Sequence, residues 1–395
     1  MGKKLTTAIA GDYSARNMME KINSSYSAKA LKLMKPILDA QDLRIMNLES
    51  AVIRDGTPIP KSGAILPMWP ENLSFIKEAN VTCAVLANNH VGDYGDEGVL
   101  STLKLLKEMN MPYVGAGCNI EESYKPWYHK SEAGILAVIA VCENEFGTAG
   151  PEIPGAAGYN VNRVFLTIQE AKTRADFVLV IMHGGNEHNP LPAPYTVERY
   201  HLFVEFGANA VIGMHPHCIQ GYETYKNAPI VYSTGNFFFH NHRGIEADDQ
   251  WYYGYLPVLT FAKDETAKLE IHPYRFDPDC TLITPYENEE KKKMLEYIQK
   301  ISEPIRDFDL LEKYFKGWCL IGGINYCSGL AGFDPKYLDM KTSPEFQKVL
   351  NIRNIFTCEA HDGLMNALFR LAEKGEMDEG REMAEKIMEL KKMPV

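Results

Sequence analysis

Two things are scarce in this sequence of 395 residues: positive charge and paired cysteines. The formal net charge is -11, so the chain has no basic excess with which to displace counterions from nucleic-acid phosphates. The eight cysteines include no CxxC pair, which favours free thiols in a reducing compartment over a disulfide framework. We therefore predict a cytoplasmic protein that does not bind nucleic acid.

Long apolar runs are also missing. The longest uninterrupted one, GILAVIAVC, is far shorter than the roughly 20 residues that cross a bilayer as a helix. The apolar stretch behind the first lysines, LTTAIA, is shorter than the core of a secretory signal. We expect no membrane span.

Short apolar strands alternate with amphipathic helices as far as about residue 262, and this alternation predicts an α/β architecture with crossover connections. From about Glu287 the pattern becomes mostly helical. We expect a first domain over residues 1–285 and a helical extension over 286–395. An apolar stripe near the end predicts packing onto the first domain or in a homodimer; it consists of Met383, Ile387 and Leu390.

Side chains with metal-binding atoms follow five of the predicted strands. Any one of them has an ordinary structural explanation, such as a helix cap for Asp12 or a core histidine for His183. Ligands in open α/β sheets gather outside the carboxyl ends of strands, however, and a set of carboxylate, amide and imidazole groups suits Mn, Fe or Zn. We therefore predict a site for divalent metal ions at these strand ends, which carry Asp12, Glu49, Asn88-Asn89-His90, His183 and His215-Pro216-His217.

The triplet His215-Pro216-His217 is the most specific of these signals. Proline fixes φ between the two histidines, and residues two apart in an extended segment point to the same side. We expect both imidazoles to face one centre.

The order of these residues resembles that of the calcineurin-like metallophosphoesterases, and the surrounding words resemble their CapA branch, the poly-γ-glutamate capsule synthesis proteins. These words run in collinear order between residue 6 and about residue 240: NLES, LANNHVGDYGDEG, VGAG, HGGNEH, GANAVIGMHPHCIQGYE and IVYSTGNFFF. The resemblance implies a four-layer α/β/β/α sandwich, metallophosphatase-like, with the metal centre at the strand ends.

The resemblance also implies roles for individual residues. Glu49 would bridge two ions. Asp12 and His217 would complete the first metal site, and the second would be completed by Asn89, His183 and His215. His90 would act as a general acid toward the leaving group, with Asp93 holding its imidazole in the protonated form.

Two departures from the phosphoesterase pattern weaken the first metal site. Ser14 stands where that pattern has a histidine, in Asp12-Tyr13-Ser14. The arginine that usually follows the bridging carboxylate is missing, and Arg54 lies too far along to replace it. We expect the site of Asp12 and His217 to be the weaker of the two.

Further polar residues follow strand ends and are predicted either to contact substrate or to cap loops. They are Asn88, Glu143, Glu145, Glu187 and Asn236. The substrate would be a small molecule or a polymer.

Three functions remain open from the sequence. The first is a metal-dependent hydrolase of a phosphoester or related anionic bond in cell-envelope or capsular polymer metabolism. The second is proton transfer without metal on a peptide-like substrate, by His90 with a carboxylate such as Asp12 or Glu145. The third is a non-catalytic accessory role in poly-γ-glutamate or capsule synthesis. The metal content of the chain separates the first from the other two.

Overall fold

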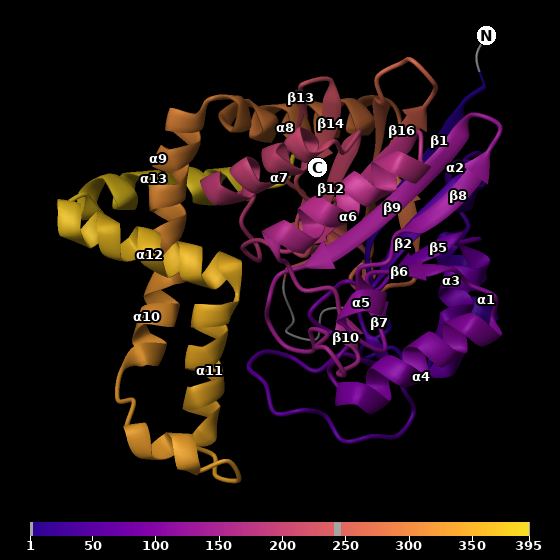
Figure 1. Ribbon diagram of the computed structural model, residues 1–395. Helices are drawn as coiled ribbons and strands as arrows, with labels where there is room; N and C mark the ends of the chain where they lie inside the picture. Colours follow the sequence, from indigo (N-terminus) through magenta and orange to yellow (C-terminus); the bar gives the residue numbers. More distant parts are fainter. Residues whose placement is uncertain (1–2, 241–245, 395) are drawn as a thin grey trace.

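Two large β-sheets packed face to face form the centre of the molecule. The structure is a computed structural model that describes residues 3–240 and 246–394. Phe177 of one sheet packs against Phe261 of the other, with ring centroids 5.3 Å apart. Helices cover the outer faces (Figure 1). This arrangement confirms the predicted four-layer α/β/β/α class.

The first sheet joins eight strands of the described residues in the order β18-β17-β16-β1-β2-β5-β6, and β15 pairs with β1. Strands β1, β2, β5 and β6 run parallel. Their carboxyl ends therefore meet at one edge. The strands are β1 (Leu5–Ser14), β2 (Leu43–Leu48), β5 (Cys83–Val85), β6 (Tyr113–Val114), β15 (Asn236–Phe239), β16 (Tyr253–Phe261), β17 (Lys268–Phe276) and β18 (Ile283–Pro285).

The second sheet joins six described strands in the order β13-β14-β12-β11-β9-β8. Strands β9, β11, β12 and β14 are parallel, and His183 lies in register with Met214, so His183 and His215 emerge side by side. The strands are β8 (Trp127–Ser131), β9 (Gly134–Cys142), β11 (Phe177–His183), β12 (Ala210–Met214), β13 (Tyr222–Tyr225) and β14 (Ala228–Val231). Short pairs join β3 (Ala51–Val52) to β4 (Pro67–Met68) and β7 (Ala116–Gly117) to β10 (Gly155–Ala156).

Several helices of residues 24–252 pack on the two large sheets, while α4 and α5 contact the short strand pairs. Phe75 of α3 stacks on Tyr13 and Phe238, with centroid distances of 4.3 and 4.8 Å, which fixes α3 on the first sheet. Helix α6 packs on β9 and β11, and α7 packs on β12. The helices are α1 (Ser24–Leu31), α2 (Lys35–Asp39), η1 (Pro70–Leu73), α3 (Ser74–Glu78), α4 (Gly95–Glu108), α5 (Ile120–Ser123), α6 (Val161–Arg174), α7 (Pro194–Phe206) and η2 (Gln250–Tyr252).

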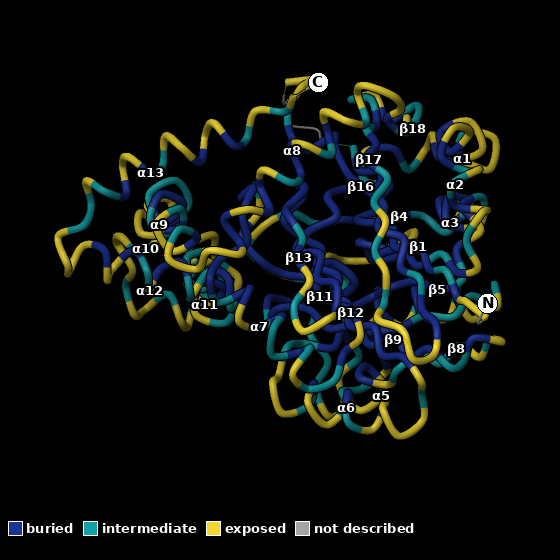
Figure 2. The backbone as a smooth tube through the Cα atoms, turned by 90° about the horizontal axis from the view of Figure 1, so that it is seen from above, coloured by how far each residue is buried: buried dark blue, intermediate teal, exposed yellow. Residues whose placement is uncertain are grey.

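After β18 every described element is helical. Helix α8 packs along β13 and β17, and α9 to α13 stand beside the sandwich as an arm (Figure 1). Exposed and intermediate residues predominate along this arm, and α10 has no buried residue (Figure 2). The elements are α8 (Asn288–Arg306), α9 (Phe308–Trp318), η3 (Cys319–Gly323), α10 (Ile324–Leu330), η4 (Pro335–Asp339), α11 (Phe346–Thr357), α12 (Glu359–Lys374) and α13 (Met377–Leu390).

The apolar stripe predicted near the chain end lies on α13 and is buried. Helix α13 packs against α9, so the stripe contributes to packing within the extension itself. No helix of the described ranges has the length and apolar character needed to cross a bilayer.

Gly11 of β1 gives a direct test of the backbone packing beside Asp12. A Cβ atom at Gly11 would lie 2.0 Å from the carbonyl oxygen of Gly235, and neither backbone can move without disturbing the sheet. We expect Gly11→Ala to lower the free energy of unfolding by about 3 kcal/mol, measured by chemical denaturation. Gly329→Ala is the control, because a Cβ there meets no atom within 4 Å. Equal stability of the two variants would contradict this packing.

Candidate metal centre

The six predicted metal ligands converge in one buried cluster where strands of both sheets end. Three come from the first sheet and the loops behind it, and three from β11 and the loop after β12. The side chains are at most 7% exposed; they are Asp12, Glu49, Asn89, His183, His215 and His217. Parallel strands of two stacked sheets end on the same side of the sandwich, which explains why residues up to 205 positions apart meet.

Glu49 lies at the centre of the cluster. Its carboxylate is fully buried, and neither oxygen has a hydrogen-bond partner among the described residues. Oε1 lies 3.6 Å from Nε2 of His183 and 3.7 Å from Nε2 of His217. Burial, followed by the nearby Asp12, raises the pKa of Glu49 well above its usual value. A buried carboxylate without donors is costly, and a cation bound among these ligands would remove that cost.

Two overlapping groups of ligands share Glu49. The ligand atoms of Asp12, Glu49 and His183 lie within 4.8 Å of one another, as do those of Glu49, His215 and His217. The expected pairing of Asp12 with His217 in one site stays a prediction: Oδ2 of Asp12 lies 3.6 Å from Nδ1 of His217, and that nitrogen is the one bonded to Asn236. The donor set of carboxylate and imidazole groups would suit one or two divalent ions, with Glu49 shared by both groups.

Neighbouring amides orient the ligands. Asn236 Oδ1 accepts a hydrogen bond from His217 Nδ1 at 2.8 Å, which turns Nε2 toward Glu49. Asn47 Nδ2 donates to Asp12 Oδ1 at 2.7 Å. Such partners fix the ring orientation and tautomer that a metal ligand needs.

The backbone of the His-Pro-His triplet differs from the expected extended segment. His215 has φ of 98° and His217 has φ of 53°, in the left-handed region that favours glycine. Strained conformations of this kind persist only where the surroundings hold them, and they cluster at functional sites. The two imidazoles do enter one cluster, with ring centroids 5.7 Å apart. The cause is this backbone turn, and the expectation of an extended segment was wrong.

His90 forms a second network beside the ligands. Its Nδ1 lies 2.8 Å from Asp93 Oδ2, and its Nε2 lies 3.8 Å from Glu49 Oε1. Burial lowers the pKa of His90, Asp93 raises it and Lys61 lowers it again, with a net downward shift. The protonated imidazole expected from the sequence is thus opposed by burial.

Lys61 was not found by sequence reasoning. Its Nζ donates to Asp93 Oδ1 at 2.6 Å, and its side chain is only 2% exposed. Burial raises the pKa of Asp93, but His90 and Lys61 outweigh this and lower it. Lys61 lies in a loop without a recognisable motif, so no local signal marked it.

The five predicted substrate contacts divide into two groups. Glu145 and Glu187 line a cavity next to the cluster. The others hold protein groups: Asn88 Nδ2 donates to Leu48 O at 2.9 Å, Glu143 pairs with Arg199 at 2.7 Å, and Asn236 orients His217. Asn88, Glu143 and Asn236 therefore position other protein groups, and their contacts are not with the cavity.

Ser14 and Arg54, the two positions that depart from the phosphoesterase pattern, each contact another protein side chain. Ser14 is buried and lies 2.8 Å from Ser50, Oγ to Oγ. Arg54 pairs with Glu71 at the surface. Arg16, in contrast, lines the cavity and brings positive charge to it.

The cavity has a volume of about 350 Å³, which is within the range of small-molecule sites. One wall carries Asn89, His90 and His217, and the opposite wall comes from the helical extension. No motif in the sequence marked the extension residues as pocket residues. The extension residues of the wall are Asn325, Tyr326, Gly329, Asn351, Asn354, Ile355 and His361.

The family model described as "Bacterial capsule synthesis protein PGA_cap" matches residues 6–241, more than half of the chain. The chain belongs to this family. It is 31% identical over 247 residues to the capsule biosynthesis protein CapA of Bacillus anthracis, covering 60% of each chain. It is 28% identical over 240 residues to the PGA biosynthesis protein CapA of Bacillus subtilis, covering 60% of this chain and 63% of the relative. The match thus spans about 60% of the length of these PGA_cap relatives.

Among solved structures, a hypothetical protein from Thermus thermophilus superposes with a TM-score of 0.46 at 16% identity, covering 69% of this chain and 99% of that one. A putative 5'-nucleotidase from Staphylococcus aureus superposes with a TM-score of 0.42 at 15% identity, covering 75% of this chain and 58% of that one.

Replacing Glu49 by glutamine tests the centre without any assay of activity. The amide removes the buried charge, so metal-free Glu49→Gln should unfold at a temperature equal to or above that of the wild type. Saturating Mn²⁺ should stabilise the wild type by about 2.7 kcal/mol at a hundredfold excess over Kd, and Glu49→Gln much less. Thermal melts with and without Mn²⁺ measure both effects.

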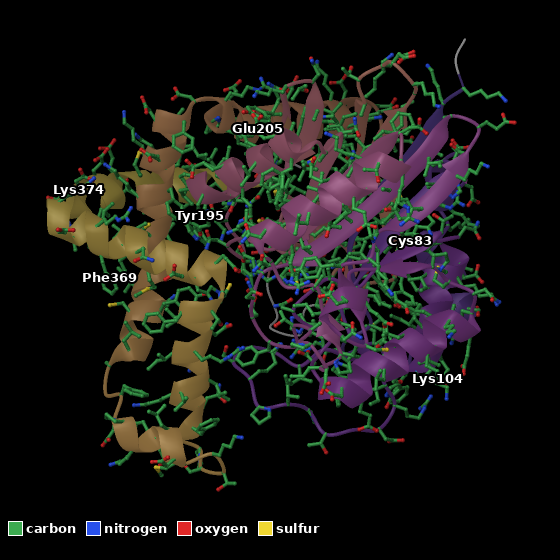
Figure 3. The ribbon with its side chains drawn as sticks, viewed as in Figure 1. Cys83, Lys104, Tyr195, Glu205, Phe369 and Lys374 are labelled. Atoms are coloured by element: carbon green, nitrogen blue, oxygen red, sulfur yellow. The ribbon has the colours of Figure 1, made fainter. Side chains whose placement is uncertain are left out.

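Glu205→Gln is the matched control, because Glu205 lies on the outer side of α7 (Figure 3). It should keep the full stabilisation by Mn²⁺. An equal Mn²⁺ effect in Glu49→Gln and the wild type would rule out Glu49 as a ligand.

Proposed function

We propose that this chain is a metal-dependent hydrolase that cleaves a phosphoester or a related anionic bond in capsular or cell-envelope polymer metabolism. The observation that carries the proposal is the carboxylate of Glu49, buried and without a hydrogen-bond donor among the described residues, between the imidazoles of His183 and His217. An uncompensated carboxylate at the side of a cavity is the environment that a bound cation requires.

The proposed ions are divalent Mn, Fe or Zn, held by Glu49 and the five other buried ligands around it. When bound, such ions lower the pKa of water to about 7 and neutralise charge on an anionic substrate.

The chain's own residues supply the other functions. His90 lines the cavity, and Asp93 holds its Nδ1, which leaves Nε2 available to donate a proton to a leaving oxygen. Lys61 keeps Asp93 in place through its buried ion pair. Arg16 adds a positive charge that favours an anionic substrate.

The names of two relatives support the polymer part of the proposal. The Bacillus subtilis relative is named a PGA biosynthesis protein, and the Bacillus anthracis relative a capsule biosynthesis protein. A substrate from capsular polymer metabolism would agree with both names. The cytoplasmic location and the homodimer stay predictions from the sequence.

Two other functions have an observation in their favour. The network of His90, Asp93 and Lys61 is complete without metal, which would suit proton transfer on a peptide-like substrate. A relative from Mycobacterium tuberculosis, 25% identical over 210 residues, is named a probable polyglutamine synthesis accessory protein. An accessory role would require no turnover.

The three functions predict different roles for His90. As a general acid it is needed for turnover but not for metal binding. We expect His90→Ala to keep the metal content of the wild type and to lower kcat/KM for an alkyl phosphate by about 10² or more. The loss on nitrophenyl phosphate should be smaller, because that leaving group hardly needs a proton.

Metal content by elemental analysis and steady-state rates measure these effects, and His129→Ala on β8 is the control. Equal losses on both substrates would mean that His90 binds metal or substrate and does not donate a proton. Metal-bound wild type without activity on phosphomonoesters, phosphodiesters or peptide-like compounds would favour the accessory role. Activity that survives metal removal would favour metal-free proton transfer.

A further inference from the structure

The wall of the cavity opposite the metal centre is made by α10, α11 and α12. It is rich in side-chain amides, with Asn325 on α10 and Asn351 and Asn354 on α11, while α12 adds His361. All of these residues lie beyond residue 241, where the family match ends. The part of the chain that distinguishes it from the common family domain therefore faces the place where substrate would bind.

Hydrogen bonds hold this wall against the loops of the sandwich. Arg353 Nη1 donates to the carbonyl oxygen of Glu145 at 2.8 Å, and Gln347 Nε2 donates to the carbonyl oxygen of Lys61 at 3.1 Å. Tyr195 lies where α7 meets the extension, and its hydroxyl donates to the carbonyl oxygen of Ala360 at 3.0 Å (Figure 3). Because these bonds reach the backbone of pocket residues, the wall has a defined position relative to the metal centre.

Asn354 is a polar residue of the wall whose side-chain oxygen lacks a hydrogen-bond donor within the part of the chain that the structure describes. It is 7% exposed, and its Nδ2 donates to Glu145 Oε2 at 3.4 Å. Its Oδ1 is buried and has no hydrogen-bond partner among the described residues. Native structures leave few buried acceptors unpaired, and Asn354 lines the cavity, so its Oδ1 is the candidate acceptor for a donor on a ligand.

The position of Asn354 indicates how close that donor must be to the reacting group. Glu145 accepts from Asn354 through Oε2 and from Asn89 Nδ2 through Oε1, the latter at 3.2 Å. One carboxylate thus separates Asn354 from a proposed metal ligand. A donor that reaches Asn354 lies within a few bonds of a group held at the metal centre.

We infer that α10 to α12 form a substrate-selecting wall, and that Asn354 Oδ1 accepts a hydrogen bond from a hydroxyl or amide N–H close to the substrate's anionic group. This inference rests on the proposed function. The ligand class is a small anionic molecule, or the end of a chain, with a donor near the anion. The cavity volume of about 350 Å³ fits a ligand of that size.

Two phosphonates that cannot be hydrolysed at the C–P bond test this inference. 3-Hydroxypropylphosphonate carries a hydroxyl donor, and butylphosphonate replaces it by a methyl group of similar size. We expect the Mn²⁺-loaded wild-type chain to bind the hydroxylated compound about tenfold more tightly, by isothermal titration calorimetry. Asn354→Leu should remove this preference by weakening only the hydroxylated compound, and Asn354→Ala is a second variant should leucine disturb folding.

Phe356→Ala is the matched control on α11, because Phe356 is 68% exposed on the same helix. It should keep the tenfold preference. Asn354 variants that weaken both phosphonates equally would show that Asn354 only holds Glu145, and would overturn the inference. A preference that survives in both Asn354 variants would also overturn it, while phosphonate binding itself would still support the anionic site. Failure of both phosphonates to bind the wild type would overturn the proposed function together with the inference.

Discussion

The buried carboxylate of Glu49 is the constraint on which the rest of the site depends. Neither of its oxygens receives a hydrogen bond among the described residues, although most buried polar groups in proteins are paired. Around it, imidazoles and the carboxylate of Asp12 leave their ligand atoms within a few ångströms of one another. Without a cation, burial and the neighbouring charge of Asp12 both disfavour the ionised form of Glu49. With one, the same geometry is a ready set of oxygen and nitrogen ligands.

The architecture explains how so many polar groups can be buried together. Each ligand lies near or just beyond the carboxyl end of a strand whose residues are almost all buried, so the apolar burial in two sheets offsets the cost of the polar cluster. Close backbone contacts at Gly11 and Gly213 let the strands and loops approach one another at the site. The amides of Asn47 and Asn236 then fix the orientation of the ligands.

The helical extension takes part in the site as well as in the packing. Its α11 and α12 bond to loops that carry Lys61, Asn144 and Glu145, and it closes the cavity opposite the proposed ions. The metal ligands come from the sandwich and the facing wall from the extension. The sandwich would then carry the catalytic groups, and the extension would select the substrate. Function is often varied in this way, by loops and added helices on a rigid scaffold.

The sequence by itself determined the α/β class and the set of residues in the cluster. Apolar runs with period two or none specify strands, and polar residues at their carboxyl ends, such as Asp12 and His183, specify a site, because both signals are local. Only the tertiary structure decided that Lys61 pairs with Asp93, that Asn236 serves His217, and that the extension lines the cavity. These contacts join segments from 19 to 286 positions apart. No spacing or periodicity encodes them, because they arise from how the sheets stack and where the helices pack.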